Sequence, residues 1–359
     1  MKILYIESAT TGHRVTHLLA FEALPHENYL MIPEFPAQST MHWIPYQNQF
    51  IEHRCFKTYL QFVKQIVEVV REYQIDLVHF LDTDSIYRYF GIELGWIPCP
   101  VLLTCHGLKT SRLHDIAIRR LYSRAEYGVI HTKHLAQRLQ SLGISNYVHI
   151  ENPMLEPMSQ LTVSQAREHF GIAQDAFTIG ALGATAAYKR MDILVEALNQ
   201  VTESCTLLVA GKADVYDEAY IRSHMTNEKV SLCLHLRWLE GSEFVDAVQA
   251  SDVLAFPYDK GFDASSSPMV SAVMHGKLAV SSDHGSLGDV MREYQLGPTV
   301  PAEDVSALAQ AIDRLARGEF SFSQQAQAFR KELDVAVFQE KYQKIYQSIQ
   351  QDGLKQKHR

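Results

Sequence analysis

The chain has 359 residues, of which 47% are hydrophobic, and its formal net charge is −8 with histidine neutral. This length suffices for two domains that each bury a full core, and the acidic balance argues against wholesale binding to nucleic acid. The five cysteines are scattered without CxxC spacing, which excludes the usual zinc and redox motifs and fits a reducing, cytoplasmic location.

The first half of the chain alternates short apolar runs with helical stretches. Strands are predicted at residues 2–6, 77–80, 101–104, 127–131 and 148–150, with helices at 11–23 and 56–73. The helix at 56–73 has an apolar face made by Phe56, Leu60, Val63, Val67 and Val70. The first strand is too short for a signal peptide, and no apolar run approaches the length that spans a bilayer. This alternation predicts a parallel sheet with both faces covered.

The pattern breaks at residues 151–165, which contain Pro153 and Pro157 and which we interpret as an interdomain linker. After it, strands are predicted at 178–181, 206–210, 230–234, 253–256 and 278–280, and helices at 190–202, 215–226, 243–250, 268–275, 286–294, 304–316 and 335–350. We therefore expect an α/β protein with two Rossmann-like domains, 1–155 and 156–334, whose parallel sheets face a central cleft. Residues 335–359 would form a C-terminal helix that packs back on the first domain.

A serine-rich helix start suits a phosphate group. Ser265, Ser266 and Ser267 precede Pro268, and serine at the cap with proline at the first helical position predicts a helix whose exposed amides seat an anion. Gly276 supplies the end of that helix. Asp263, just before the serines, would shape the pocket. The plainer interpretation is a capped helix with a solvated aspartate.

A second phosphate-compatible segment lies earlier in the same half. Gly183 lets the backbone approach a ligand closely, and Lys189 and Arg190 follow at the start of a helix, where they could neutralise a diphosphate. Alternatively, the two cations are a solvated pair with Asp192 as a partner. Two such segments in one half of the chain favour a nucleotide-linked substrate.

Other candidate residues stand at predicted strand ends. Trp238 and Leu239 lie in a loop that could hold a base, although a buried tryptophan at a strand–helix junction is at least as common. Ser242 is a candidate cap for the helix that follows. His106 follows the strand at 101–104, where a functional histidine is expected, and Gly12 follows the first strand, where a loop can approach a diphosphate.

The absent motifs narrow the function. No GxGxxG follows the first strand, which counts against a dinucleotide oxidoreductase, and no GxxxxGK[ST] is present, which counts against a P-loop enzyme. Asp82 and Asp84 match a DxD pattern only formally. We favour a loop or acceptor-pocket role for them over metal binding.

These segments together resemble a family 4 glycosyltransferase of the GT-B fold. The resemblance runs through CPVLLTCHGLK and IENPM in the first half, and through GALGATAAYKRMDILVEAL, LLVAGKAD and ASSSPMVSAVMHGK in the second. It implies transfer from a nucleoside-diphosphate sugar with retention of anomeric configuration, and neither a cofactor nor a catalytic metal. By the same resemblance, Lys189 binds the donor diphosphate, His106 lies near the reacting sugar, Gly12 lies beside the phosphates, and Ser265 and Ser266 hold the sugar or the phosphate.

The sequence departs from the family pattern at two places. Ala186 stands where the family usually has arginine, three residues before the lysine, and Asp263 and Ser271 stand where it usually has two glutamates. Ser271 would then bind the ribose weakly. These departures motivate a rival function, a non-catalytic GT-B-like subunit of a transferase complex. A GT-B nucleotide-sugar epimerase is the other rival.

The acceptor is a glycan, lipid-linked or protein hydroxyl that the sequence does not identify. A predicted helix at 112–124 carries four cations, Arg112, Arg119, Arg120 and Arg124, with Lys109 just before it. These residues could bring the protein to the inner membrane face through anionic lipid headgroups, or they could be a solvated helix face, which is the commoner arrangement.

Overall fold

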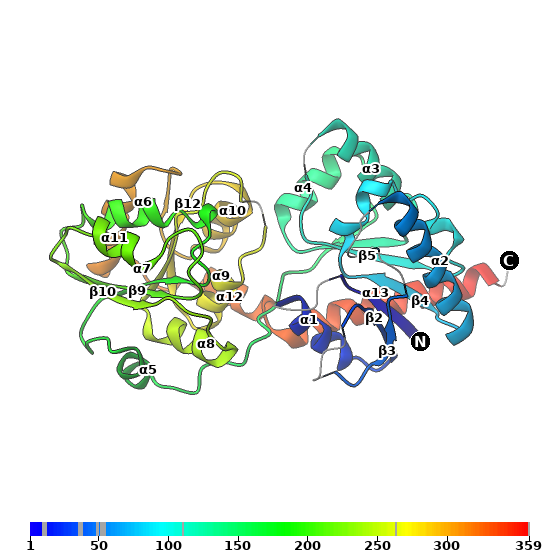
Figure 1. The fold of residues 1–359 in the computed structure, drawn as a ribbon, viewed down its shortest axis with the longest axis horizontal. Helices are drawn as coiled ribbons and strands as arrows, with labels where there is room; N and C mark the ends of the chain where they lie inside the picture. Colours follow the sequence, from blue (N-terminus) through cyan, green and yellow to red (C-terminus); the bar gives the residue numbers. More distant parts are fainter. Residues whose placement is uncertain are drawn as a thin grey trace. The chain divides into compact units, whose positions relative to one another are not determined.

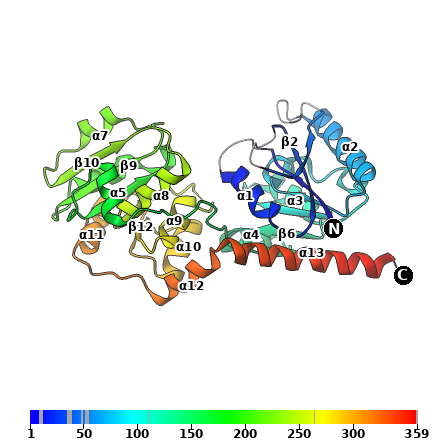
Figure 2. The same cartoon turned by 90° about the horizontal axis from the view of Figure 1, so that it is seen from below.

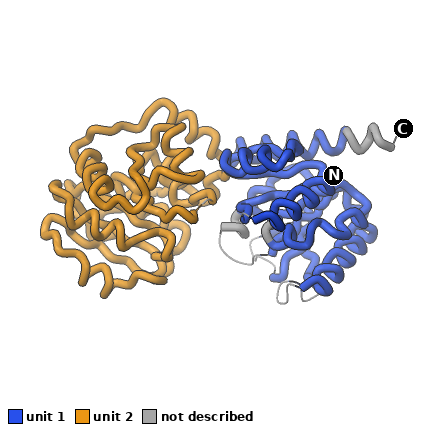
Figure 3. The backbone as a smooth tube through the Cα atoms, turned by 90° about the horizontal axis from the view of Figure 1, so that it is seen from above, with its two compact units in different colours: residues 1–151, 335–359 blue, residues 152–334 orange. Residues whose placement is uncertain are grey.

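The computed structural model describes residues 1–8, 13–34, 39–47, 50, 55–109, 111–262 and 264–357. It divides the chain into two compact units, shown in different colours in Figure 3. Unit 1 comprises Met1–Glu151 and Val335–Arg359, and unit 2 comprises Asn152–Asp334. The C-terminal segment therefore belongs to the same unit as the first 151 residues.

The described part of unit 1 forms a seven-stranded parallel sheet in the order β3-β2-β1-β4-β5-β6-β7 (Figure 1). Its strands are β1 (Lys2–Ile6), β2 (Glu27–Ile32), β3 (His42–Pro45), β4 (Leu77–Phe80), β5 (Val101–Cys105), β6 (Tyr127–Ile130) and β7 (Tyr147–His149). Its helices are α1 (His13–Glu22), α2 (Phe56–Tyr73), α3 (Arg112–Tyr122), α4 (Lys133–Ser141) and α13 (Val335–Lys357), with short 3₁₀ turns η1 (Thr83–Ser85), η2 (Tyr87–Tyr89) and η3 (Leu94–Trp96).

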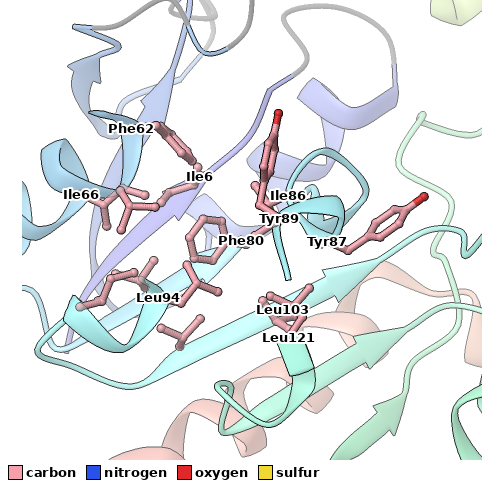
Figure 4. Packing of buried hydrophobic residues seen from close by; sticks show 14 of the residues in the cluster. Ile6, Phe62, Ile66, Phe80, Ile86, Tyr87, Tyr89, Leu94, Leu103 and Leu121 are labelled. Carbon is pink, nitrogen blue, oxygen red and sulfur yellow. The ribbon is translucent and has the colours of Figure 1, made fainter. Parts of the chain in front are cut away.

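Successive side chains along a strand point to opposite faces of the sheet, so they pack in two separate cores. Ile6 and Phe80 pack with Phe62 and Ile66 of α2 in the main apolar cluster of unit 1 (Figure 4). Tyr5, one residue before Ile6, points to the other face, where its ring contacts Phe21 of α1. The sheet is thus buried on both sides, as expected for parallel strands.

Helix α13 covers part of that second face and lies along unit 1 (Figure 2). Phe338, Tyr342 and Tyr346 of this helix are fully buried, and their rings contact Phe21 and His79. The Tyr346 hydroxyl and His79 Nδ1 are 2.9 Å apart, and His79 Nε2 lies 2.8 Å from Thr104 Oγ1. A buried polar group therefore joins the last helix to two strands.

The described part of unit 2 forms a six-stranded parallel sheet in the order β10-β9-β8-β11-β12-β13 (Figure 1). Its strands are β8 (Thr178–Leu182), β9 (Cys205–Ala210), β10 (Val230–His235), β11 (Val253–Phe256), β12 (Leu278–Ser282) and β13 (Thr299–Val300). Its helices are α5 (Val163–Phe170), α6 (Met191–Leu198), α7 (Glu218–His224), α8 (Gly241–Ala250), α9 (Ser267–Met274), α10 (Gly285–Tyr294), α11 (Val305–Ala316) and α12 (Gln324–Glu332). Alternate residues of β11 enter the two apolar cores of this unit.

Several elements differ from the sequence expectations. Strands β2, β3 and β13 and helices α5 and α12 were not predicted, and α5 begins inside the segment interpreted as a linker. The helix at 56–73 has the predicted bounds, but Phe56, expected on its apolar face, is 50% exposed. Within the described residues, no helix combines the length and the hydropathy needed to cross a membrane.

Candidate functional site

The candidate site lies at the carboxyl ends of β8 and β11, which are neighbours in the sheet of unit 2. Directly after β8, Gly183 adopts φ +88°, and its N–H donates to the Ala210 carbonyl at 2.8 Å. The chain of Gly211 passes so close that a Cβ there would come 2.3 Å from the Gly183 oxygen. Two glycines therefore allow the loops after β8 and β9 to lie backbone against backbone.

Lys189 folds back onto the end of β8. Its Nζ donates to the Leu182 carbonyl at 2.8 Å, and it lines a small pocket together with Gly183, Pro257 and Tyr258. Burial lowers the pKa of Lys189 to about 8, because the ammonium loses hydration and no carboxylate pairs with it among the contacts of the described residues. An unpaired cation at the edge of a pocket is a binding group for an anion.

Thr185 fixes the shape of the loop that carries this lysine. Its hydroxyl donates to the Tyr216 carbonyl at 2.6 Å and accepts from the Asp214 N–H at 2.9 Å. Its own N–H donates to the Lys212 carbonyl at 3.1 Å. The loop after β8 is thereby tied to the loop after β9, which holds Lys189 in place.

The second wall of the pocket is the segment between β11 and α9. The Asp259 N–H donates to the Tyr188 carbonyl at 2.8 Å, and the rings of Tyr188 and Phe262 stack at 5.1 Å. Tyr258 lines the pocket beside Lys189, and the nearby Ser266 hydroxyl offsets part of the rise that burial imposes on the Tyr258 pKa. The lysine loop and the serine-rich helix start are therefore neighbours.

Helix α9 begins close to the predicted place. Ser266 is its N-cap residue, but its side chain makes no capping hydrogen bond, and Pro268 is the second helical residue where the sequence predicted the first. Gly276 follows the end of the helix with φ +68°, as predicted. Ser265 and Ser267 are half-buried, whereas Ser271 is only 1% exposed inside the unit. Asp263 lies outside the described residues.

Arg190 is engaged by acidic groups. Its Nη2 lies 2.9 Å from Asp192 Oδ2, and its Nη1 pairs with Glu303. The hydrogen bonds that Arg190 donates to Asp192 are the main reason that the pKa of Arg190 rises above its usual range. For Arg190, the structure therefore shows the second of the two interpretations from the sequence, which is pairing with Asp192. Of the two cations, Lys189 is the one that no carboxylate of the described residues compensates, so it is the one left for an anion in the pocket.

The tryptophan loop occupies another part of unit 2. Trp238 follows β10, the edge strand, and is 69% exposed, so the interpretation of a buried tryptophan is wrong. Leu239 beside it is half-buried. The helix that follows is capped by Glu240 and Glu243 in a reciprocal capping box, and the expected cap at Ser242 lies inside the helix.

In unit 1, His106 follows the carboxyl end of β5 and is half-buried. Its Nε2 lies 3.0 Å from the Leu81 carbonyl, and its ring lies near those of His17 and His131. Burial lowers the pKa of His131 to about 4. Gly12 lies outside the described residues. No group of three or more His, Cys, Asp or Glu side chains in the described part of the chain is arranged to hold a metal ion.

Sequence reasoning missed the aromatic residues that join the two loops of the site. Tyr188, Tyr258 and Phe262 contact one another through their rings, and all three come from segments read as loops. The available signal was their position: each lies within six residues of a strand end or helix start that had already been singled out.

Residues 175–317, all in unit 2, match the model of a family described as glycosyl transferases group 1. A phosphatidyl-myo-inositol mannosyltransferase of Mycobacterium leprae (strain TN) is 29% identical over 177 residues, which are 46% of this chain and 45% of that protein. The chain thus aligns with less than half the length of this relative. Both matches are to glycosyltransferases, and each spans less than half of this chain.

Solved structures resemble the chain over almost its whole length. HepE of Anabaena in complex with UDP and glucose has a TM-score of 0.75 at 17% identity, covering 97% of this chain and 100% of that one. A glycosyltransferase from Rickettsia africae ESF-5 has a TM-score of 0.75 at 15% identity, covering 97% and 98%. At these identities the likeness concerns the fold alone. It confirms the predicted GT-B class, in which two Rossmann-like units each carry a parallel sheet.

Proposed function

We propose that this chain is a glycosyltransferase that moves a sugar from a nucleoside-diphosphate donor to an acceptor hydroxyl. The observation that carries the proposal is the pocket after β8, in which the ammonium group of Lys189 meets no carboxylate among the described residues and adjoins the approach to α9. The match to glycosyl transferases group 1 supports it, as does the similarity to HepE, which is solved with UDP and glucose.

The chemistry follows from the charge that develops on the leaving group. As the glycosidic bond breaks, negative charge grows on the diphosphate, and preorganised donors at that position lower the barrier. Lys189 and the N–H groups at the start of α9 supply such donors. We propose that no metal is needed for this step.

We further propose that the reaction retains the anomeric configuration. The acceptor would attack the face from which the diphosphate leaves, and a phosphate oxygen would take the acceptor proton, so that no enzymic nucleophile is required. His106 would lie near the reacting sugar, as its resemblance to the family histidine implies. Nuclear magnetic resonance of the product anomer tests retention separately from activity.

The test of the function is Lys189→Ala, assayed for sugar transfer from a panel of nucleotide sugars. Loss of one charged donor should raise the barrier by about 3 kcal/mol, a rate loss of roughly 100-fold or more. Lys331→Ala, which removes an exposed lysine from α12, is the control with the same charge change and should keep full activity. Equal activity of both variants would contradict the assignment.

Two rival functions have distinct outcomes. A nucleotide-sugar epimerase would release a changed sugar nucleotide without any acceptor present. A non-catalytic subunit, suggested by Ala186 and Ser271, would show no heat of binding with UDP or any other nucleoside diphosphate in calorimetry. Binding of UDP that Lys189→Ala abolishes, together with transfer to an acceptor, supports the transferase.

A further inference from the structure

The segment between β12 and α10 holds the loop that leads into α9. Three side chains of this segment donate hydrogen bonds to carbonyl groups of that loop. The pairs are Ser282 with Tyr258 at 2.8 Å, His284 with Asp259 at 2.6 Å, and Ser286 with Ala264 at 2.9 Å. Ser282 and Ser286 are buried, which shields their hydroxyl groups from water. The path of the loop is therefore set by residues that follow it by 22 to 25 positions in the chain.

His284 is turned away from its own helix. It is the N-cap residue of α10, but its side chain makes no capping hydrogen bond. A carbonyl oxygen can only accept, so Nε2 carries the ring proton and donates to Asp259. Nδ1 is buried and has no hydrogen-bond partner among the described residues. Serine, threonine, aspartate or asparagine would cap the helix better, so the stability of α10 does not explain the histidine at this position.

Asp259 connects His284 to the loop that carries Lys189. The Asp259 carbonyl accepts from His284, and the Asp259 N–H donates to the Tyr188 carbonyl at 2.8 Å. Tyr188 directly precedes Lys189 in the chain, and its ring stacks on that of Phe262. Two hydrogen bonds therefore join the imidazole to the residue next to the candidate diphosphate-binding lysine.

The backbone of the histidine is fixed independently of the loop. Asp283, the residue before it, donates its N–H to the Val300 carbonyl of β13 at 2.7 Å. The Asp283 carboxylate pairs with Arg292 of α10. The backbone at His284 is thus held by the sheet and by α10. A side chain can hold a neighbouring loop in place only when its own backbone is held elsewhere, and His284 meets this condition.

We propose that His284 is a positioning residue that holds Lys189 where it meets the donor diphosphate. It acts through the backbone of Asp259 and Tyr188 and not through contact with the ligand. This inference rests on the proposed function of the pocket after β8. A charged donor stabilises a leaving group only when it is accurately placed, so a displaced loop would reduce the contribution of Lys189 without removing its charge.

Calorimetry with UDP compares two replacements of this histidine. In His284→Gln the side-chain amide can still donate to the Asp259 carbonyl, whereas His284→Leu fills a similar volume and cannot donate. We expect the leucine variant to bind UDP about 5- to 10-fold more weakly, which is the contribution of one hydrogen bond, and the glutamine variant to bind within about twofold of the wild type. Binding by the leucine variant at wild-type strength, or equal weakening in both variants, would overturn the proposal.

The matched control is His224→Leu. It also removes a hydrogen bond between an imidazole and a carbonyl group, that of His224 Nδ1 with Tyr220 at 2.8 Å, from an exposed position on α7. This variant should bind UDP as the wild type does. A loss as large as that of His284→Leu would show that the effect is not specific to the donor site and would contradict the proposal.

A double-mutant cycle shows whether His284 acts through Lys189. Sugar transfer is measured for the wild type, His284→Leu, Lys189→Ala and the double variant. The change at His284 should lower kcat/KM about 5- to 10-fold when the lysine is present and less than about twofold when it is absent, because no ammonium group then needs to be positioned. Equal losses in both backgrounds would show that His284 acts independently of Lys189, which would overturn the proposal.

Hydrogen exchange of the free protein tests the same contacts without ligand or activity. The Asp259 N–H should exchange faster in His284→Leu than in the wild type and in His284→Gln, while the amides of α11 should exchange at one rate in all three. Unchanged exchange at Asp259, or faster exchange throughout unit 2, would contradict a local role. Failure of the proposed function gives a different result: the expected exchange pattern would appear, but the wild type would bind no nucleoside diphosphate. His284 would then hold the loop without a donor to serve, and the proposal would fail with the function.

Discussion

At the scale of single residues, the proposed site depends on Lys189. The sequence singled it out because a glycine-containing loop after a strand leads to a lysine at a helix start. It offered Asp192 as a partner for Arg190, the adjacent cation, which the structure bears out, but it could not reveal the second partner, Glu303, because Glu303 is distant in the chain. Nor could it reveal that Ser271 is buried, because a serine in a helix of eight residues fits either face.

Gly183→Ala separates backbone strain from loss of the site. A Cβ at this position would come 2.7 Å from Lys189 Nζ, and φ +88° is unfavourable for alanine. Gly318→Ala is the matched control, because Gly318 has φ +72° with open space around it. We expect each variant to lose about 1–2 kcal/mol of stability in urea unfolding. Only Gly183→Ala should weaken UDP binding in calorimetry, and equal binding by both variants would contradict the contact with Lys189.

The lowered pKa of Lys189 predicts a pH dependence of donor binding. Because the folded-state pKa is about 8, the side chain is charged below this pH and loses its charge above it. UDP binding should therefore weaken as the pH rises from 7 to 9.5. The midpoint of this loss should lie above the pKa of the free protein, because the bound anion favours the charged form of Lys189. In Lys189→Ala the residual binding should not weaken over this range. Parallel profiles for the two proteins would show that another group is responsible.

At the scale of elements, the sequence predicted the long α2 and most central strands because apolar runs and helical periodicity were unambiguous there. The sequence analysis missed β2, although Pro25 and Pro33 flank its apolar run. It also missed β13, which has only two residues. Helix α5 was hidden by the prolines of the supposed linker. Its signal was the capping box formed by Thr162 and Gln165, which the structure confirms.

The contact between α13 and the sheet of unit 1 predicts acid sensitivity. Burial lowers the pKa of His79 to about 3 and that of His131 to about 4, from an ordinary value of 6.5. The unfolded chain binds these protons at higher pH than the folded chain, so the stability is complete above about pH 6.5 and falls as the pH drops toward 4.

The measurement is the melting temperature at pH 7 and at pH 5. His79→Gln should melt lower at pH 7, because it disturbs the bonds to Tyr346 and Thr104, but it should lose less on acidification than the wild type. His224→Gln, at an exposed position on α7, is the control and should follow the wild type. A loss in His79→Gln as large as that in the wild type would contradict a role for this imidazole.

At the scale of the whole molecule, the described residues form two parallel sheets of seven and six strands, which are the two Rossmann-like units that strand–helix alternation predicted. The more specific prediction of a GT-B fold came from the family resemblance, and the similar solved structures confirm it. The fold could be predicted from the sequence because it depends on repeated apolar patterns. The identities of the donor and the acceptor could not be predicted, because the shape of the pocket is set by loop contacts such as the stacking of Tyr188 on Phe262. We propose more narrowly that Lys189 and the start of α9 bind one diphosphate.

The most direct test is a crystal structure of the chain with UDP. We expect a phosphate oxygen within hydrogen-bond distance of Lys189 Nζ, which would exchange its bond to the Leu182 carbonyl for the ligand. The same diphosphate should accept from an N–H group or a serine hydroxyl at residues 265–268. A diphosphate bound away from either group, with the ammonium group still on the Leu182 carbonyl, would contradict the account.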